Sequence, residues 1–308
     1  MIPTGLLESV DLARAITQSL RDPLMDKKGL HADVLRLDLI HPIISGNKWF
    51  KLKYHLQEAK RLNKTGLVSF GGAFSNHLLA AACASALEGL ESVAIIRGEE
   101  PAVYSPTLLQ LQQYGMQLVF ISRNDYKNKA QLQESLSPQF NNHYWINEGG
   151  QSEWGIKGAA EILSLVPDMD HSHIICAVGT GTMMAGLINS SRPHQHVIGI
   201  PVLKISNHNE NDLISFLNKN STNDRYTISY NHHEGGYAQK NESLIRFMNK
   251  FYMQHSIPTD FVYTGKLFKG IYQLIEQDYF PAGSKLLLIH SGGLQGNRSL
   301  TEGSLIFG

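Results

Sequence analysis

A lysine stands where a turn leads into a helix, in the segment Ser45 to Lys48. A lysine at such a boundary can point into a cleft, where loss of water or a nearby cation lowers its pKa from about 10.4 and permits Schiff-base formation. Lys51 and Lys53 follow within five residues, so the same amines also fit an ordinary solvated basic stripe. The segment by itself leaves both interpretations open.

A glycine-containing turn at residues 179 to 182 could bind an anion. It follows an apolar run and precedes a helix, so its backbone N–H groups and the helix N-terminus could hold a phosphate without a lysine. The turn matches neither the dinucleotide motif nor the P-loop. A plain strand-to-helix turn explains it equally well.

A second such turn, Gly71 to His77, ends in three polar residues. Ser75 or Asn76 could simply cap the following helix. The same side chains and backbone N–H groups could instead hold a carboxylate or a phenolic oxygen. His77 could be a base, a hydrogen-bond donor or a polar residue satisfied within the core.

Short apolar runs alternate with helical stretches, which predicts a parallel sheet covered by helices. The predicted strands are 67–70, 92–96, 117–121, 173–178, 197–203, 261–263 and 285–289, and the predicted helices are 75–87, 106–114, 155–165, 183–189, 241–254 and 265–277. Residues 218–239 should be mostly loop. Because ligands bind beyond the carboxyl ends of parallel strands, the turns at 71–76, 179–182, 263–266 and 290–293 should share one site.

The composition narrows the class of protein. Lys plus Arg and Asp plus Glu both number 27 among 308 residues, so no global field favours nucleic acid or an anionic membrane. Glu8, Asp11 and Arg14 interrupt the apolar residues near the N-terminus, so we expect neither a signal peptide nor a membrane span. Cys83 and Cys176 lie far apart in apolar segments, as reduced thiols of a cytoplasmic protein would.

Taken together, these motifs resemble the pyridoxal-phosphate enzymes that include 1-aminocyclopropane-1-carboxylate deaminase and D-cysteine desulfhydrase. The resemblance covers roughly residues 30 to 295, with the motifs in the same order. The segments that carry it are 46–48 (cofactor lysine), 71–77 (substrate turn), 147–150 (hinge strand), 179–182 (phosphate cup) and the signatures at 235–237, 263–266 and 290–293.

The resemblance implies an α/β fold of tryptophan-synthase β type, fold type II, with two lobes of open parallel sheet and helices on both faces. Residues 1–52 and 148–308 would form the large cofactor-binding domain, and residues 53–147 the small one. It also implies pyridoxal 5'-phosphate as cofactor, a small amino acid as substrate, a homodimer and no metal ion.

The resemblance further implies a role for each site residue. Lys48 would form the Schiff base and then move a proton, and Tyr237 and Tyr263 would lie against cofactor and substrate, where a phenol can stack or transfer a proton. Asn76 would bind the cofactor's 3'-oxygen. The phosphate would be held by the backbone of Gly179, Thr180, Gly181 and Thr182, and the substrate carboxylate by Ser75, Asn76 and His77.

Two departures from the family pattern bear on the reaction. Thr264 stands where the cyclopropane-opening deaminases have a glutamate that keeps the pyridine nitrogen protonated, so Thr264 or Ser291 would be its hydroxyl partner and the ring a weaker electron sink. Together with His77, this favours β-elimination from a D-cysteine-like substrate over ring opening. Phe50 also replaces the usual arginine. The alternatives are a β-replacing synthase and a non-catalytic protein that binds pyridoxal phosphate or an amino acid.

Overall fold

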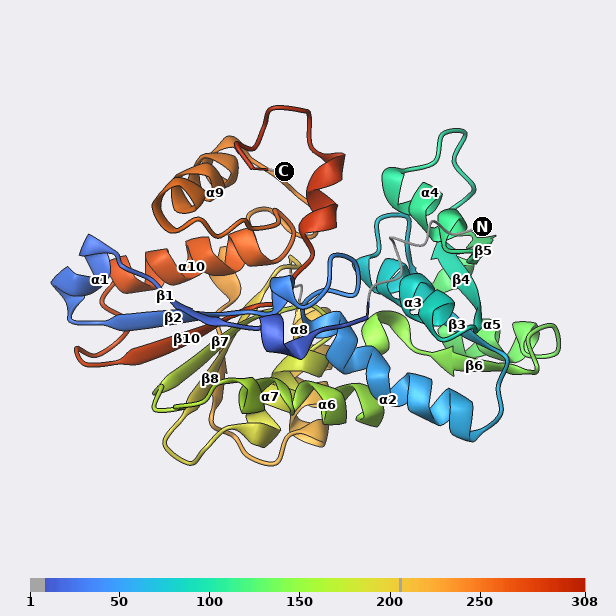
Figure 1. Cartoon of the computed structure of the whole chain (residues 1–308), viewed down its shortest axis with the longest axis horizontal. Helices are drawn as coiled ribbons and strands as arrows, with labels where there is room; N and C mark the ends of the chain where they lie inside the picture. Colours follow the sequence, from blue (N-terminus) through green and yellow to red (C-terminus); the bar gives the residue numbers. More distant parts are fainter. Residues whose placement is uncertain (1–8, 205–206, 308) are drawn as a thin grey trace.

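Two sheets organise the chain in the computed structural model, which describes residues 9–204 and 207–307 (Figure 1). The larger has six strands in the order β1-β2-β10-β7-β8-β9, and the smaller has four in the order β5-β4-β3-β6. The named strands pair in parallel except for β1 with β2, which are antiparallel. The parallel α/β architecture predicted from the sequence is confirmed.

The elements have the following bounds. The strands of the large sheet are β1 (Thr17–Ser19), β2 (His31–Arg36), β7 (His173–Val178), β8 (His196–Pro201), β9 (Tyr226–Ile228) and β10 (Lys285–His290). Those of the small sheet are β3 (Gly66–Gly72), β4 (Glu91–Arg97), β5 (Gln117–Ile121) and β6 (His143–Ile146). The helices are α1 (Pro23–Lys28), α2 (Asn47–Arg61), α3 (Asn76–Leu87), α4 (Pro106–Gln113), α5 (Lys129–Leu136), α6 (Glu153–Ala159), α7 (Thr182–Ser190), α8 (Asn207–Asn220), α9 (Glu242–His255) and α10 (Thr264–Glu276).

Helices cover both faces of the large sheet, with α9 and α10 on one side and α6 and α7 on the other (Figure 1). Strand β10 has an unbroken apolar run, residues 286–289, because both of its faces are buried. Leu286 and Leu288 pack into the core under α9 and α10, whereas Leu287 and Ile289 pack into the core with α6 and α7. Successive side chains of a strand point to opposite faces, so a sheet buried on both faces needs apolar residues at every position.

Most predicted elements are present with small shifts at their ends, but two predictions were wrong. The expected helix 155–165 ends at Ala159 and continues as a short 3-10 helix over 162–165. Residues 261–263 form a turn rather than a strand, because the Asp260 carboxylate accepts backbone N–H groups from Val262, Tyr263 and Thr264 at 2.8–2.9 Å. Within the predicted loop 218–239, the structure adds β9 and the end of α8.

The proposed domain boundaries remain a prediction. All four strands of the small sheet lie between residues 66 and 146, but α2, where the first boundary falls, packs against α6. Among the described residues, no helix combines the length and apolar character needed to cross a membrane. Glu8, used above against a signal peptide, lies outside the described residues.

Candidate active site

The turn that precedes Lys48 is fixed by close contact with the turn after β10. Gly46 has φ +63°, and a Cβ at this position would lie 1.8 Å from the carbonyl oxygen of Ser291. The Asn47 N–H donates to the same carbonyl oxygen at 3.3 Å. A glycine is therefore required at position 46, because a side chain there would push the Lys48 turn away from Ser291.

Lys48 has the electrostatic setting of a reactive amine. Burial lowers its pKa from 10.5 to about 8, and the nearby Asp260 carboxylate opposes that shift. Its Nζ lies 5.7 Å from the centroid of the Tyr263 ring and donates to Asn47 Oδ1 at 2.7 Å. A lysine with this pKa has a substantial fraction of neutral amine near pH 8, which is the nucleophilic form.

Lys51 is not part of a solvated stripe, so that alternative is wrong for this residue. Only 6% of its surface is exposed, and its Cβ packs against Gly150. Burial and the charge of Lys48 together hold the pKa of Lys51 well below its ordinary value. A second amine that is costly to charge when unpaired makes the pocket favourable for an anion. This role could not be predicted from the sequence, because the spacing of the lysines does not tell which face of α2 is buried.

The N-terminus of α3 brings together the three polar residues predicted to meet the substrate. The Ser75 hydroxyl oxygen accepts the Leu78 N–H at 3.2 Å and so caps the helix, while its own proton remains available. Asn76 and His77 are buried, and Asn76 Oδ1 and His77 Nδ1 have no hydrogen-bond partner among the described residues. The first backbone N–H groups of a helix also lack partners inside the helix, so this end can accept an anion.

The turn Gly179 to Thr182 leads into α7 and lies against Gly149, where a Cβ would be 2.9 Å from the Thr180 side chain. Gly181 has φ +80°, and a Cβ there would lie 2.9 Å from Leu213. The Thr180 and Thr182 hydroxyl oxygens lie 3.0 Å apart, and Gln151 Nε2 donates to the Thr180 carbonyl at 3.0 Å. These contacts hold the turn in a shape in which its N–H groups can converge on a phosphate.

Two tyrosines link this turn to Lys48. A Cβ on Gly179 would lie 3.6 Å from the Tyr263 ring, and the Tyr237 ring stands edge-on to Tyr263 with centroids 6.2 Å apart. Burial raises the pKa of Tyr263 well above 10, so its hydroxyl stays protonated at neutral pH. The buried Lys266 amine donates to the Gly236 carbonyl and anchors the turn that carries Tyr237.

The two hydroxyl residues considered as partners of a pyridine nitrogen differ in their surroundings. Thr264 is fully buried; its hydroxyl donates to Asp260 Oδ1 at 2.7 Å and accepts the Asp260 N–H at 2.8 Å. The Ser291 side chain makes no hydrogen bond within the described part of the chain. Ser291 therefore has a free donor, whereas the Thr264 proton is committed to Asp260.

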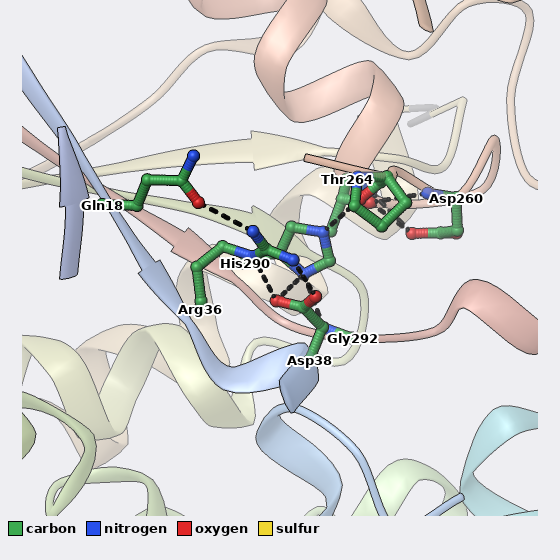
Figure 2. Close-up of polar contacts among 8 residues, drawn as sticks. Gln18, Arg36, Asp38, Asp260, Thr264, His290 and Gly292 are labelled. Atoms are coloured by element: carbon green, nitrogen blue, oxygen red, sulfur yellow. Dashed lines mark hydrogen bonds and ion pairs between the residues drawn. The ribbon is translucent and has the colours of Figure 1, made fainter. Parts of the chain in front are cut away.

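A buried network behind Ser291 was not found from the sequence. The Asp38 carboxylate receives two hydrogen bonds from Arg36, at 2.8 and 2.7 Å, and Oδ1 also lies 3.2 Å from His290 Nδ1 (Figure 2). Arg36 Nη1 donates to Gln18 at 2.8 Å, and His290 Nε2 donates to the Pro258 carbonyl at 2.7 Å. The network ties the edge of the large sheet to the residue before Ser291.

This arrangement defines a site for an aldehyde cofactor that carries an anionic group. The Lys48 amine, the turn 179–182 and the Tyr263 ring lie close together, and the buried Lys51 amine and the unpartnered atoms of Asn76 and His77 belong to neighbouring residues of α2 and α3. The model of the pyridoxal-phosphate dependent enzyme family matches residues 21–292, and the chain belongs to that family. Its cofactor is pyridoxal 5'-phosphate, and the donors present fit that group.

Relatives of known name support this assignment over most of the chain. The bifunctional D-cysteine desulfhydrase/1-aminocyclopropane-1-carboxylate deaminase of Arabidopsis thaliana is 28% identical over 82% of this chain and 70% of its own length. The D-cysteine desulfhydrase of Yersinia enterocolitica is 25% identical over 88% of each chain. A crystal structure of an ACC deaminase homologue superposes with a TM-score of 0.80 at 24% identity, covering 95% of this chain and 92% of the other, which confirms the predicted fold.

Proposed function

We propose that the protein is a pyridoxal-phosphate dependent lyase that removes ammonia from a small amino acid, by α,β-elimination from a D-cysteine-like substrate. The observation that carries this proposal is the Lys48 amine, with a pKa of about 8, placed against Tyr263. The names of the similar proteins point to the same pair of reactions, desulfhydration and cyclopropane deamination.

Each residue of the site would have a separate role in an elimination reaction. The cofactor supplies delocalisation of the negative charge that develops at the α-carbon. The N-terminus of α3 and the Ser75 hydroxyl would hold the substrate carboxylate, and Lys48 would move the α-proton. Tyr263, which stays protonated, would donate to the leaving group, with Tyr237 beside it. Lys51 and the turn 179–182 would hold the phosphate, and Asn76 the 3'-oxygen.

Elimination is favoured over ring opening by the donors near the pyridine end. We place the Ser291 hydroxyl, which has no hydrogen-bond partner in the described part of the chain, at the ring nitrogen, because the Thr264 hydroxyl already donates to Asp260. A hydroxyl donor suits an unprotonated ring nitrogen, which is a weaker electron sink than a pyridinium. Expulsion of a good leaving group from the β-carbon demands less of that sink than opening of a cyclopropane does.

The test combines substrate profiling with identification of the cofactor lysine. D-cysteine, L-cysteine, D-serine, β-chloro-D-alanine and 1-aminocyclopropane-1-carboxylate are supplied separately, and 2-oxo acid release is measured. We expect β-substituted D-amino acids to react best, and borohydride reduction followed by mass spectrometry to label Lys48. Turnover of the cyclopropane substrate alone would reverse the preference. Labelling of a different lysine would contradict the proposal as a whole.

We also infer that the protein is a cytoplasmic homodimer. Cys83 and Cys176 are both buried free thiols, which suits a reducing compartment. The dimer rests on resemblance to the family. Light scattering of the purified protein and fractionation of cells test the two statements, and a monomer or an exported protein would contradict them.

A further inference from the structure

The hydrogen bonds around His77 determine which ring nitrogen carries its proton. His77 Nε2 lies 2.9 Å from Ser69 Oγ, and Ser69 Oγ lies 2.9 Å from the carbonyl oxygen of Ile146. A carbonyl oxygen only accepts, so the Ser69 hydroxyl gives its one proton to Ile146. Ser69 is then the acceptor in its contact with His77, and the proton of the neutral imidazole lies on Nε2.

This tautomer leaves His77 Nδ1 with a bare lone pair inside the protein. His77 is 4% exposed, and no donor among the described residues reaches Nδ1. Burial, followed by the charges of Lys48 and Lys51, holds the pKa of His77 well below its usual value, so the ring remains neutral near pH 7. A buried acceptor without a donor costs free energy, so a donor that enters the site gains affinity there.

The neighbours of His77 indicate what that donor is. The start of α3 offers N–H donors to an anion, and His77, in the first turn of that helix, offers in Nδ1 a neutral acceptor for an N–H group. A carboxylate binds the first feature but cannot satisfy the second. An α-amino acid carries a carboxylate and an amino group on the same carbon and so matches both. Lys48, the residue that the amino group must replace on the cofactor, lies close enough to lower the pKa of His77.

We propose that His77 Nδ1 accepts a hydrogen bond from the amino group of the substrate and holds that nitrogen beside Lys48. This assignment rests on the proposed function and gives His77 a role different from carboxylate binding. The ring is not a base in this step, because it accepts a hydrogen bond without becoming protonated. It selects α-amino acids over acids that lack the amine.

Glycine and acetate differ only in the amino group and therefore separate this role from carboxylate binding. Binding of each to the holoenzyme is measured by calorimetry in wild type, His77→Gln and His77→Asn. The asparagine oxygen takes the place of Nδ1, whereas the glutamine amide takes the place of Nε2. We expect His77→Gln to bind glycine about tenfold more weakly, the effect of one lost hydrogen bond to an ionic group, with acetate unchanged. His77→Asn should retain most of the glycine affinity.

Two results would overturn the proposal: unchanged glycine affinity in His77→Gln, or equal weakening of glycine and acetate. A second measurement needs no cofactor. In ¹⁵N spectra of the cofactor-free protein, His77 Nδ1 should be unprotonated, and Ser69→Ala should allow both tautomers because Nε2 loses its acceptor. A protonated Nδ1 in wild type would also refute the assignment. Failure of Lys48 labelling would instead refute the proposed function and leave the tautomer result standing.

Discussion

The Asn47 N–H and the Ser291 carbonyl oxygen, 244 residues apart in sequence, are joined by a hydrogen bond of 3.3 Å. This contact places the turn before Lys48 directly against the turn after β10. The lysine and the proposed ring-nitrogen partner are therefore positioned by one backbone contact, and the glycine at position 46 makes that contact possible.

Gly46→Ala should separate these two turns. The new methyl group would meet the Ser291 carbonyl at 1.8 Å, and the positive φ adds strain. We expect loss of cofactor retention or of folding, measured by visible absorbance and circular dichroism. Gly115→Ala is the matched control, because its φ is +78° but no atom lies within 4 Å of its Cβ. Equal behaviour of the two variants would mean that strain alone, not the contact, matters.

Thr264→Val should change mainly the stability of the protein, whereas Ser291→Ala should change mainly its activity. Thr264→Val leaves the buried Asp260 N–H without its acceptor and removes one of the four hydrogen bonds to the Asp260 carboxylate, which should lower the free energy of unfolding by about 1–3 kcal/mol. Ser291→Ala removes a hydroxyl with no described partner, so stability should hold while kcat and the cofactor absorption spectrum change. Urea unfolding and steady-state kinetics measure both. A spectral change in Thr264→Val alone would exchange the two roles.

The depressed pKa of Lys48 predicts the pH dependence of cofactor capture. The neutral amine predominates above a pKa of about 8, so the rate of Schiff-base formation by cofactor-free protein should rise with pH and level off above that value. An ordinary lysine, with a pKa of about 10.4, would give a rate that keeps rising beyond pH 9. Stopped-flow absorbance follows the reaction, and Lys48→Ala provides the blank. A rate without a plateau would contradict the burial of the amine.

Local patterns predicted the parts of this site that are backbone turns, and missed the parts that depend on packing between distant segments. The turns at 179–182 and 71–77 follow apolar strands, β7 of the large sheet and β3 of the small sheet, so their position at the carboxyl ends of strands could be inferred. Burial of Lys51 depends on α2 packing against α6, which the lysine spacing does not reveal. Residues 261–263 have strand-like side chains, but four hydrogen bonds to one buried carboxylate, that of Asp260, outweigh that preference.

Asp38→Asn should lower the free energy of unfolding, because Asp38 is the acceptor in the buried network with Arg36 and His290. Although burial raises the pKa of Asp38, His290 and Arg36 hold it below its ordinary value, so its charge stabilises the fold above about pH 4 and that contribution is lost as pH falls further. Removing one partner of a buried ion pair costs about 3 kcal/mol or more, because Arg36 is left without its counter-charge. Urea unfolding at pH 7 measures the loss.

The control for this variant is Asp170→Asn, which breaks the ion pair between Asp170 and Lys285. The side chain of Asp170 is 65% exposed and that of Lys285 is 47% exposed. Exposed pairs are screened by water and contribute little, so stability should not change. His290 lies between Asp38 and Ser291, so the Asp38 variant should also bind pyridoxal phosphate more weakly, while the Asp170 variant should not. If Asp38→Asn unfolds at the same urea concentration as wild type, the network in Figure 2 does not stabilise the pyridine end of the site.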